Sequence, residues 1–175
     1  MKLAKTIVAS LLAAAALTAQ ADTITNVTDG TWNQFFFGDN GSTWLDDYAF
    51  NSPGMLSFSI ELSGPAILKI TDAGLTGDIF QIFDNGNALG FTSAANTANT
   101  TDIGVDYDSA YASSDWSHGQ WILSAGTHLI TGIATTSFYG AGDGAIQVAT
   151  VPEPSSFALA LCGLGLIGLM ARRRV

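Results

Sequence analysis

Residues 55–62 read Met-Leu-Ser-Phe-Ser-Ile-Glu-Leu, and this alternation decides the fold class. Leu56, Phe58, Ile60 and Leu62 fall on one face of an extended chain, because the side chains of a strand alternate with a period of two. Serines and a glutamate fill the other face. One apolar and one polar face are typical of a strand in an antiparallel sheet that covers a core. The stretch therefore predicts a half-buried β-strand.

Outward from this stretch, short apolar segments alternate with turn signals. Asp39-Asn40-Gly41 and Asp84-Asn85-Gly86-Asn87 each contain Asn-Gly, the preferred centre of a tight hairpin because both residues accept a positive φ. No part of the middle region shows helical periodicity. The sequence predicts strands at 32–37, 44–50, 55–62, 65–71, 78–83, 88–92, 120–124, 127–134 and 145–150. This pattern predicts an all-β fold, an antiparallel two-sheet sandwich that is jelly-roll-like.

Alternation also assigns single residues to faces. The run Phe35-Phe36-Phe37 must place at least one ring on each face of its sheet. Trp44 and Trp121 begin apolar strands and are expected to pack inward. His128 is expected at the surface or at a sheet edge. No G-x-S-x-G motif accompanies the two histidines, so a catalytic triad is not indicated.

The charge of the middle region excludes one class of partner. Residues 22–151 contain fourteen acidic side chains and one lysine, Lys69, which gives a formal charge of −13. Such a surface repels phosphate backbones and anionic lipid, so no nucleic-acid partner is expected. The acidity suits divalent cations, and it also keeps an exported domain dispersed. The single cysteine, Cys162, excludes an intrachain disulfide.

One long segment interrupts the strands. Residues 93–117 are rich in Ser, Thr, Asn, Asp and Ala, and loops of this length are usually functional or disordered. Asp102, Asp106 and Asp108 concentrate carboxylates there, and in extended chain the last two point to the same side, where they can share a calcium ion. Solvated loop aspartates are the alternative. Trp116 is the tryptophan expected to be exposed and able to stack on a sugar ring, with packing as its alternative.

Other acidic residues leave two further alternatives open. Asp72 and Asp78 can close the loop 73–77 around an ion. A glycoside hydrolase needs two carboxylates about 5–10 Å apart, but Glu61 is the only glutamate of the middle region. Most aspartates there stand beside Gly or Asn, where turns favour them. We therefore expect no enzymatic activity, no catalytic residue and no resident cofactor, with Ca²⁺ as the one metal that the loop aspartates suit.

The N-terminal residues have the pattern of an export signal. Lys2 and Lys5 precede an apolar stretch at 7–17, and Ala19 and Ala21 form the A-x-A pattern that signal peptidase cleaves. The pattern predicts a signal peptide over residues 1–21 and a mature chain that begins at Asp22.

The C-terminal residues contain three parts in order. The tripeptide Pro152-Glu153-Pro154 is followed by an uncharged stretch at 155–171, and then by Arg172, Arg173 and Arg174. Seventeen uncharged, mostly apolar residues can cross a thin bilayer as a helix that rises ~1.5 Å per residue. The arginines are expected to stay on the cytoplasmic side. A plain tail anchor is the alternative, although it does not require the two prolines.

This tail resembles the PEP-CTERM sorting signal of Gram-negative bacteria, which consists of a Pro-Glu-Pro motif, a short apolar helix and a terminal arginine cluster. The resemblance implies recognition by an exosortase, an intermediate in the inner membrane, and delivery to the cell surface or an exopolysaccharide matrix. The expected organisation is a signal peptide at 1–21, a β-sandwich domain at 22–150 and a sorting signal at 151–175.

A second resemblance covers approximately residues 68–148. Two runs in this region are similar to an uncharacterised element of secreted bacterial and fungal proteins. They are Gly77-Asp78-Ile79-Phe80-Gln81-Ile82-Phe83-Asp84-Asn85-Gly86 and Trp121-Ile122-Leu123-Ser124-Ala125-Gly126-Thr127-His128. The resemblance implies a secreted β-domain and carries over no catalytic residue.

Three functions from different classes follow from the sequence. The favoured one is a structural or adhesive protein of the cell surface or exopolysaccharide matrix. The second is a calcium-dependent carbohydrate-binding module with its site in residues 93–117. The third is a hydrolase of matrix polysaccharide. In each case extracellular polysaccharide is the expected partner outside the cell.

Overall fold

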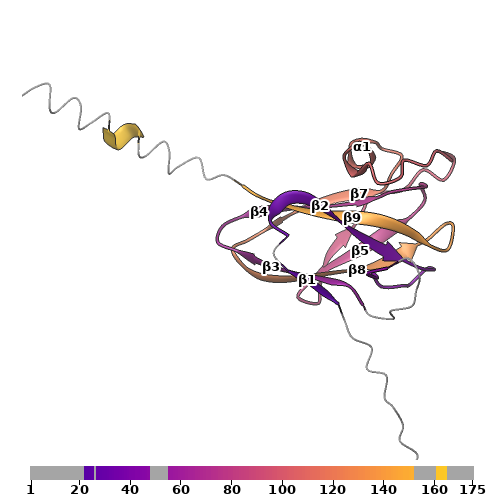
Figure 1. Ribbon diagram of the computed structural model, residues 1–175, viewed down its shortest axis with the longest axis horizontal. Coiled ribbons are helices and arrows are strands. Elements are labelled where there is room, and N and C mark those ends of the chain that lie inside the picture. The colour runs from indigo at the N-terminus through magenta and orange to yellow at the C-terminus, as the bar shows by residue number, and fades with distance from the viewer. Residues whose placement is uncertain (1–21, 26, 48–54, 152–160, 165–175) are drawn as a thin grey trace, which may run out of the picture.

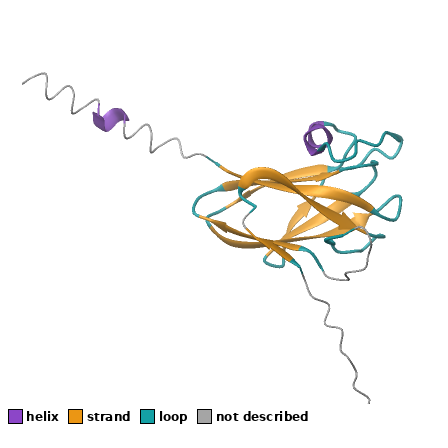
Figure 2. Cartoon of the chain, viewed as in Figure 1, coloured by secondary structure: helices purple, strands orange, loops and turns teal. Residues whose placement is uncertain are grey.

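Two β-sheets pack face to face in the structure, a computed structural model that describes residues 22–25, 27–47, 55–151 and 161–164 (Figure 1; Figure 2). The first sheet has the order β1 (Thr23–Thr25), β3 (Ser57–Leu62), β8 (Gly126–Thr136), β5 (Ile79–Asp84) and β6 (Asn87–Phe91). The second has the order β2 (Asp29–Phe37), β9 (Gly142–Thr150), β4 (Ala66–Asp72) and β7 (His118–Leu123).

The strand order is that of a jelly-roll-like sandwich. Among the named strands of the described residues, all pairs are antiparallel except β1 with β3. From β2 onward, consecutive strands lie in opposite sheets except β5 and β6, which form a hairpin. Its turn is the predicted Asn-Gly pair, with φ of 50° at Asn85 and 79° at Gly86. The predicted all-β, largely antiparallel two-sheet sandwich is confirmed.

The core lies between the two sheets. The four alternating apolar residues of the stretch 56–62 point into it, and all of them are at most 4% exposed. Aromatic rings fill the same core: Phe35 stacks on Trp44 with ring centroids 4.1 Å apart, and Phe37 meets Phe80 edge-on at 4.9 Å. Complete burial of each such side chain stabilises the fold by ~1.5–3 kcal/mol. The core therefore holds the sandwich together without a disulfide.

The predicted strand at 44–50 is wrong within the described residues. Trp44 is fully buried, as expected, but its neighbours form only two isolated bridges, from Thr43 to Ile133 and from Leu45 to Phe36. Residues 48–50 lie outside the described ranges. The buried indole, more than a ladder of hydrogen bonds, anchors this segment to the core.

His128 is not at a surface or an edge, which corrects the expectation from alternation. It lies on β8, the middle strand of the five-stranded sheet, and is 6% exposed. Its Nδ1 lies 2.7 Å from Asp84 Oδ2, and its Nε2 lies 3.0 Å from the carbonyl oxygen of Ser124. These two hydrogen-bond partners explain how the imidazole of His128 can be buried in a central strand, because a buried polar group is costly unless it is hydrogen-bonded.

The two ends of the chain lie almost entirely outside the described ranges. This holds for the signal peptide at 1–21 with Ala19 and Ala21, for Pro152, Glu153 and Pro154, and for Arg172, Arg173 and Arg174. Of the predicted span at 155–171, residues 161–164 are described, and they are helical. In the part of the chain that the structure describes, no helix has both the length and the apolar character needed to cross a membrane.

Candidate functional site

The segment 93–117 contains a helix, contrary to the prediction of a structureless loop. Helix α1 (Tyr107–Ala112) begins at Asp106, whose carboxylate accepts a hydrogen bond from the backbone N–H of Ser109 at 3.2 Å. This is an N-cap, which satisfies a backbone donor that the first turn leaves free. Asp108 accepts from the indole N–H of Trp32 on β2 at 2.8 Å. The expectation that Asp106 and Asp108 lie in extended chain is therefore wrong, since Asp106 caps the helix and Asp108 lies in its first turn.

Trp116 is buried, which corrects the prediction of an exposed stacking ring. Its side chain is 5% exposed, and its indole N–H donates to the carbonyl oxygen of Gly74 at 3.1 Å. A ring in this position has no face available for a sugar. The alternative that the sequence left open, packing, is the one that the fold adopts.

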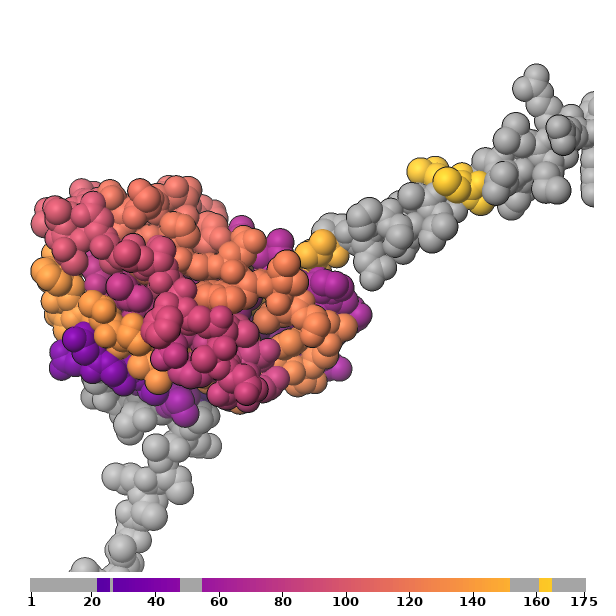
Figure 3. All heavy atoms as spheres, turned by 180° about the vertical axis from the view of Figure 1, so that it is seen from behind, coloured from indigo at the N-terminus to yellow at the C-terminus, as the bar shows by residue number. Residues whose placement is uncertain are grey.

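Hydrogen bonds fasten the segment 93–117 to the loop 73–77 between β4 and β5. The backbone of Gly74 donates to Gly104 at 3.1 Å and accepts from Ile103 at 3.0 Å. Thr76 Oγ1 lies 2.6 Å from the carbonyl oxygen of Asn96. The polar groups of the segment thus make local hydrogen bonds, and the segment lies at the surface of the domain (Figure 3).

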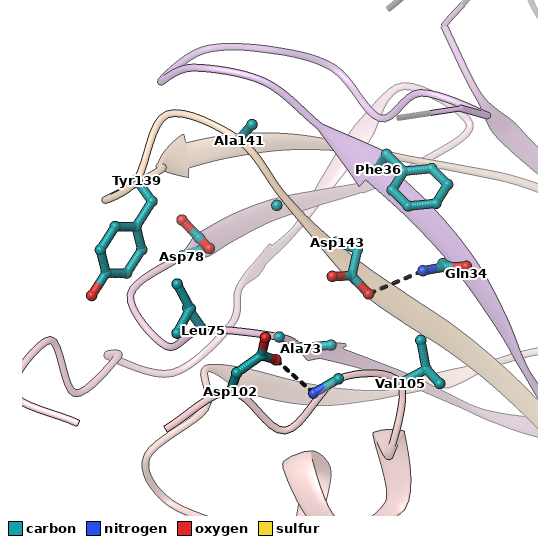
Figure 4. A pocket seen from close by; sticks show the side chains of 13 residues that line it. Gln34, Phe36, Ala73, Leu75, Asp78, Asp102, Val105, Tyr139, Ala141 and Asp143 are labelled. Carbon is teal, nitrogen blue, oxygen red and sulfur yellow. Dashed lines mark hydrogen bonds between the residues drawn. The ribbon is translucent and has the colours of Figure 1, made fainter. Parts of the chain in front are cut away.

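A cleft of about 330 Å³ opens where these loops meet the outer face of the four-stranded sheet (Figure 4). Strands β2 and β9 supply Gln34, Phe36 and Asp143, and the segment 93–117 supplies Asp102 and Val105. The loop 73–77 and the turn between β8 and β9 complete it, with Leu75, Tyr139 and Asp78 among their contributions. Phe36 faces the cleft because its two neighbours in the Phe-Phe-Phe run point into the core, as the alternation predicted.

Two carboxylates converge on one point of the cleft. A Cβ placed on Gly74 would lie 3.1 Å from Asp143 Oδ1 and 3.9 Å from Asp102 Oδ1. The other oxygen of Asp143 accepts from the side-chain amide of Gln34 at 3.1 Å, and Asp102 Oδ1 accepts from the backbone of Gly104 at 2.8 Å (Figure 4). A glycine at 74, with φ of 58°, leaves the room between them open.

The electrostatics of the cleft favour the neutral forms of its acids. Burial, and to a lesser extent the charge of Asp102, raises the pKa of Asp143. Burial also raises the pKa of Asp78 to about 6, with a smaller contribution from Asp143. Burial and the charge of Asp143 raise the pKa of Tyr107 to about 12. Negative charge on the cleft wall is therefore costly in the ligand-free protein.

Asp72 and Asp78 hold the loop 73–77 by hydrogen bonds to the backbone. Asp72 is fully buried; one of its oxygens accepts from Ala73 N at 2.9 Å, and the other lies 3.3 Å from Asp78 N. Asp78 accepts from Phe138 N at 2.9 Å, which ties this loop to the turn before β9. Burial, together with the nearby charge of Asp78, raises the pKa of Asp72 well above its usual range.

The three aspartates that the sequence analysis grouped as calcium ligands therefore do not lie together in one site. Of the three predicted calcium ligands, only Asp102 lines the cleft, and its neighbours there come from distant parts of the chain. Within the described residues, no group of three or more His, Cys, Asp or Glu side chains is arranged to hold a metal ion. The sequence patterns did not indicate Asp143 as a site residue. The one sequence feature that pointed to the outer face of the four-stranded sheet was the outward ring of the Phe35-Phe36-Phe37 run.

Comparison with known proteins identifies the tail. Residues 150–174 match the PEP-CTERM protein-sorting motif. The chain therefore carries a PEP-CTERM sorting signal, which implies export and processing by an exosortase. None of the curated protein sequences matches it significantly.

Two solved structures are similar to the domain. One is the pre-peptidase C-terminal domain of a collagenase from Bacillus anthracis, with 8% identity, a TM-score of 0.40, and coverage of 74% of this chain and 94% of that one. The other is the C-terminal CBM6 of LamC, a marine laminarinase from Zobellia galactanivorans, with 15% identity, a TM-score of 0.36, and coverage of 67% and 100%. Both are too distant to transfer a function.

Proposed function

We propose that this protein is a structural or adhesive component of the cell surface or exopolysaccharide matrix of a Gram-negative bacterium. The PEP-CTERM motif at 150–174 is the observation that carries this proposal. Signal peptidase releases residues 1–21, the helix at 155–171 holds an intermediate in the inner membrane, and an exosortase then processes the tail. The β-sandwich at 22–150 is the part that acts outside the cell.

The domain has properties that suit such a role. Its core is built from apolar side chains of both sheets, so it needs no disulfide or partner to bury them. Its formal charge of −13 over residues 22–151 keeps it dispersed and away from anionic polymers. A hydroxyl-rich or cationic polymer is a better match for this surface than a polyanion.

We further propose that the role is non-enzymatic and needs no resident metal ion. Several acidic side chains have structural tasks: Asp72 and Asp78 fix a loop, and the exposed Asp106 caps α1. A test for hydrolysis is the release of new reducing ends from the native exopolysaccharide. Release that disappears in Asp143→Asn would establish an enzyme and overturn this part of the proposal.

The intact mass of the protein, measured in envelope and matrix fractions of the native cells, tests the sorting proposal. We expect a species that begins at Asp22, lacks Arg172–Arg174 and occurs in the surface or matrix fraction. A species that retains Val175 and stays in the inner membrane would identify a tail-anchored protein instead. Replacement of Pro152 and Pro154 by alanine provides the matched unprocessed control.

A further inference from the structure

The cleft combines a polar wall, an aromatic rim and a volume suited to a small organic group. Its volume of about 330 Å³ is at the lower end of the range for ligand pockets, and it far exceeds the space needed by a bare ion. Asp78 lines it although it is only 2% exposed, so the wall reaches well below the surface. Tyr139 at the rim remains 46% exposed, and Val105 on the opposite side 65%.

Among the described residues, no basic side chain lines this cleft and neutralises its acids. Lys69 is the only lysine or arginine in the described ranges, and its ammonium lies over the ring of Tyr111, 4.9 Å from the centroid. Lys69 does not line the cleft. Asp143 and Asp102 therefore face one another across Gly74 without a protein counter-charge, which raises the energy of the doubly ionised state.

The residues that line the cleft favour an organic cation over a metal ion. A calcium ion takes 6–8 oxygen ligands, whereas the described residues offer no cluster of three or more acids that would hold a metal. An aromatic face beside carboxylates instead favours an organic ammonium, which is attracted by both the ring and the negative charge. Leu75 and Tyr139 lie together on one side of the cleft, and its volume admits an amine carried on a single sugar ring (Figure 4).

We infer that this cleft binds the protonated amine of an amino sugar within an extracellular polysaccharide. The inference rests on the proposed function, since that function supplies a polysaccharide partner. The ammonium donates to Asp143 Oδ1 and to Asp102, and the sugar ring packs against Tyr139. Gln34 holds Asp143 in place through its hydrogen bond, and is a positioning residue.

Calorimetric titration of the exported protein, as the native cells process it and purified in mild detergent, tests this inference. The probe is a fully deacetylated glucosamine oligosaccharide, and its N-acetylated counterpart of equal length is the control without charge. We expect the amine form to bind about tenfold more tightly at a pH where it is protonated, the difference that one partly buried ion pair provides. Equal affinities would overturn the inference.

Three variants locate the site. Asp143→Asn keeps the acceptor for Gln34 and removes the charge, so it should fold normally and lose about tenfold in affinity. Tyr139→Ala should lose severalfold for both oligosaccharides, because stacking does not need the charge. Glu61→Gln changes the net charge equally but lies exposed on β3 in the other sheet, and should bind as the wild type does. A loss in Glu61→Gln equal to that in Asp143→Asn would reveal general charge attraction and overturn the site.

Competition distinguishes the other occupants. Displacement of the oligosaccharide by millimolar CaCl₂ would assign the cleft to a metal ion. Tighter, Asp143-dependent binding of a lysine peptide would assign it to a protein partner. Either result overturns the inference. Failure of binding in a protein found processed in the matrix leaves the proposed function intact. Binding by a protein confined to the inner membrane supports the site and removes the proposed function.

Discussion

At Asp78, a single buried carboxylate makes the stability of the sandwich depend on pH. Its pKa is about 6 in the folded protein and 3.8 in the unfolded reference, so the folded state binds the proton more tightly. The associated stability is fully present below pH 3.8 and is lost as the pH rises through about 6. Asp72, whose pKa is raised in the same direction by burial and by Asp78, extends the effect to higher pH.

We therefore expect the free energy of unfolding to decrease between about pH 4 and pH 7, and Asp78→Asn to flatten that decrease by about 2 kcal/mol. The amide keeps the oxygen that accepts from Phe138 N. Urea unfolding at a series of pH values measures the slope. Glu61→Gln, an exposed acid, should leave it unchanged, whereas an unaltered slope in Asp78→Asn would assign the dependence to other groups.

Gly132 on β8 is required by the indole that packs on it. A Cβ at this position would lie 2.2 Å from Trp44 Cε2, a distance that real contacts do not allow. Gly132→Ala should destabilise the domain by about 2 kcal/mol, because the buried ring cannot move away. Trp44 Nε1 has no hydrogen-bond partner among the described residues, so Trp44→Phe sacrifices no hydrogen bond there.

A double-mutant cycle tests this contact. In the Trp44→Phe background, Gly132→Ala should cost at least ~1 kcal/mol less than in the wild type, since the smaller ring lacks the clashing Nε1 and Cζ2 of the indole. Thermal unfolding of the four proteins measures the coupling. Additive effects would mean that the two residues do not constrain one another.

At the scale of elements, polar groups of the segment 93–117 fasten it to itself and to β2. Asp106 caps α1, Asp108 binds the indole of Trp32, and Asp115 accepts from the side-chain amides of Asn96 and Asn99, each at 2.8 Å. The sequence composition that resembled a calcium loop therefore has another physical use. Caps and Asx turns need the same residue types as oxygen-rich metal sites.

We expect the melting temperature to be the same in calcium chloride and in a chelator. A bound ion at a hundredfold excess over its dissociation constant would add about 2.7 kcal/mol, which a thermal scan detects easily. Asp108→Asn serves as the matched variant, because it retains an acceptor for Trp32 but removes a charge. A rise in melting temperature with calcium that is absent in Asp108→Asn would support the calcium site first predicted from the sequence.

At the scale of the molecule, sorting and ligand binding belong to different parts of the chain. The motif at 150–174 directs the protein to its destination, while the cleft is made by residues between 34 and 143. We expect Asp143→Asn to be exported and processed like the wild type, and the double replacement of Pro152 and Pro154 by alanine to fold but stay unprocessed. Fractionation with intact-mass measurement reads out both proteins. A processing defect in Asp143→Asn would mean that the domain itself takes part in sorting.

The sequence by itself determined the sorting tail, the fold class and the hairpin at Asn85-Gly86, because each depends on local order: three consecutive parts, a period of two, and a residue that accepts positive φ. Only the tertiary structure decided the site. Asp143 and Asp102 lie 41 positions apart in the sequence and meet at Gly74. Trp116 is buried because its indole also contacts Gly74. Such neighbours depend on how loops pack after the sheets have formed, and neither periodicity nor composition records that packing.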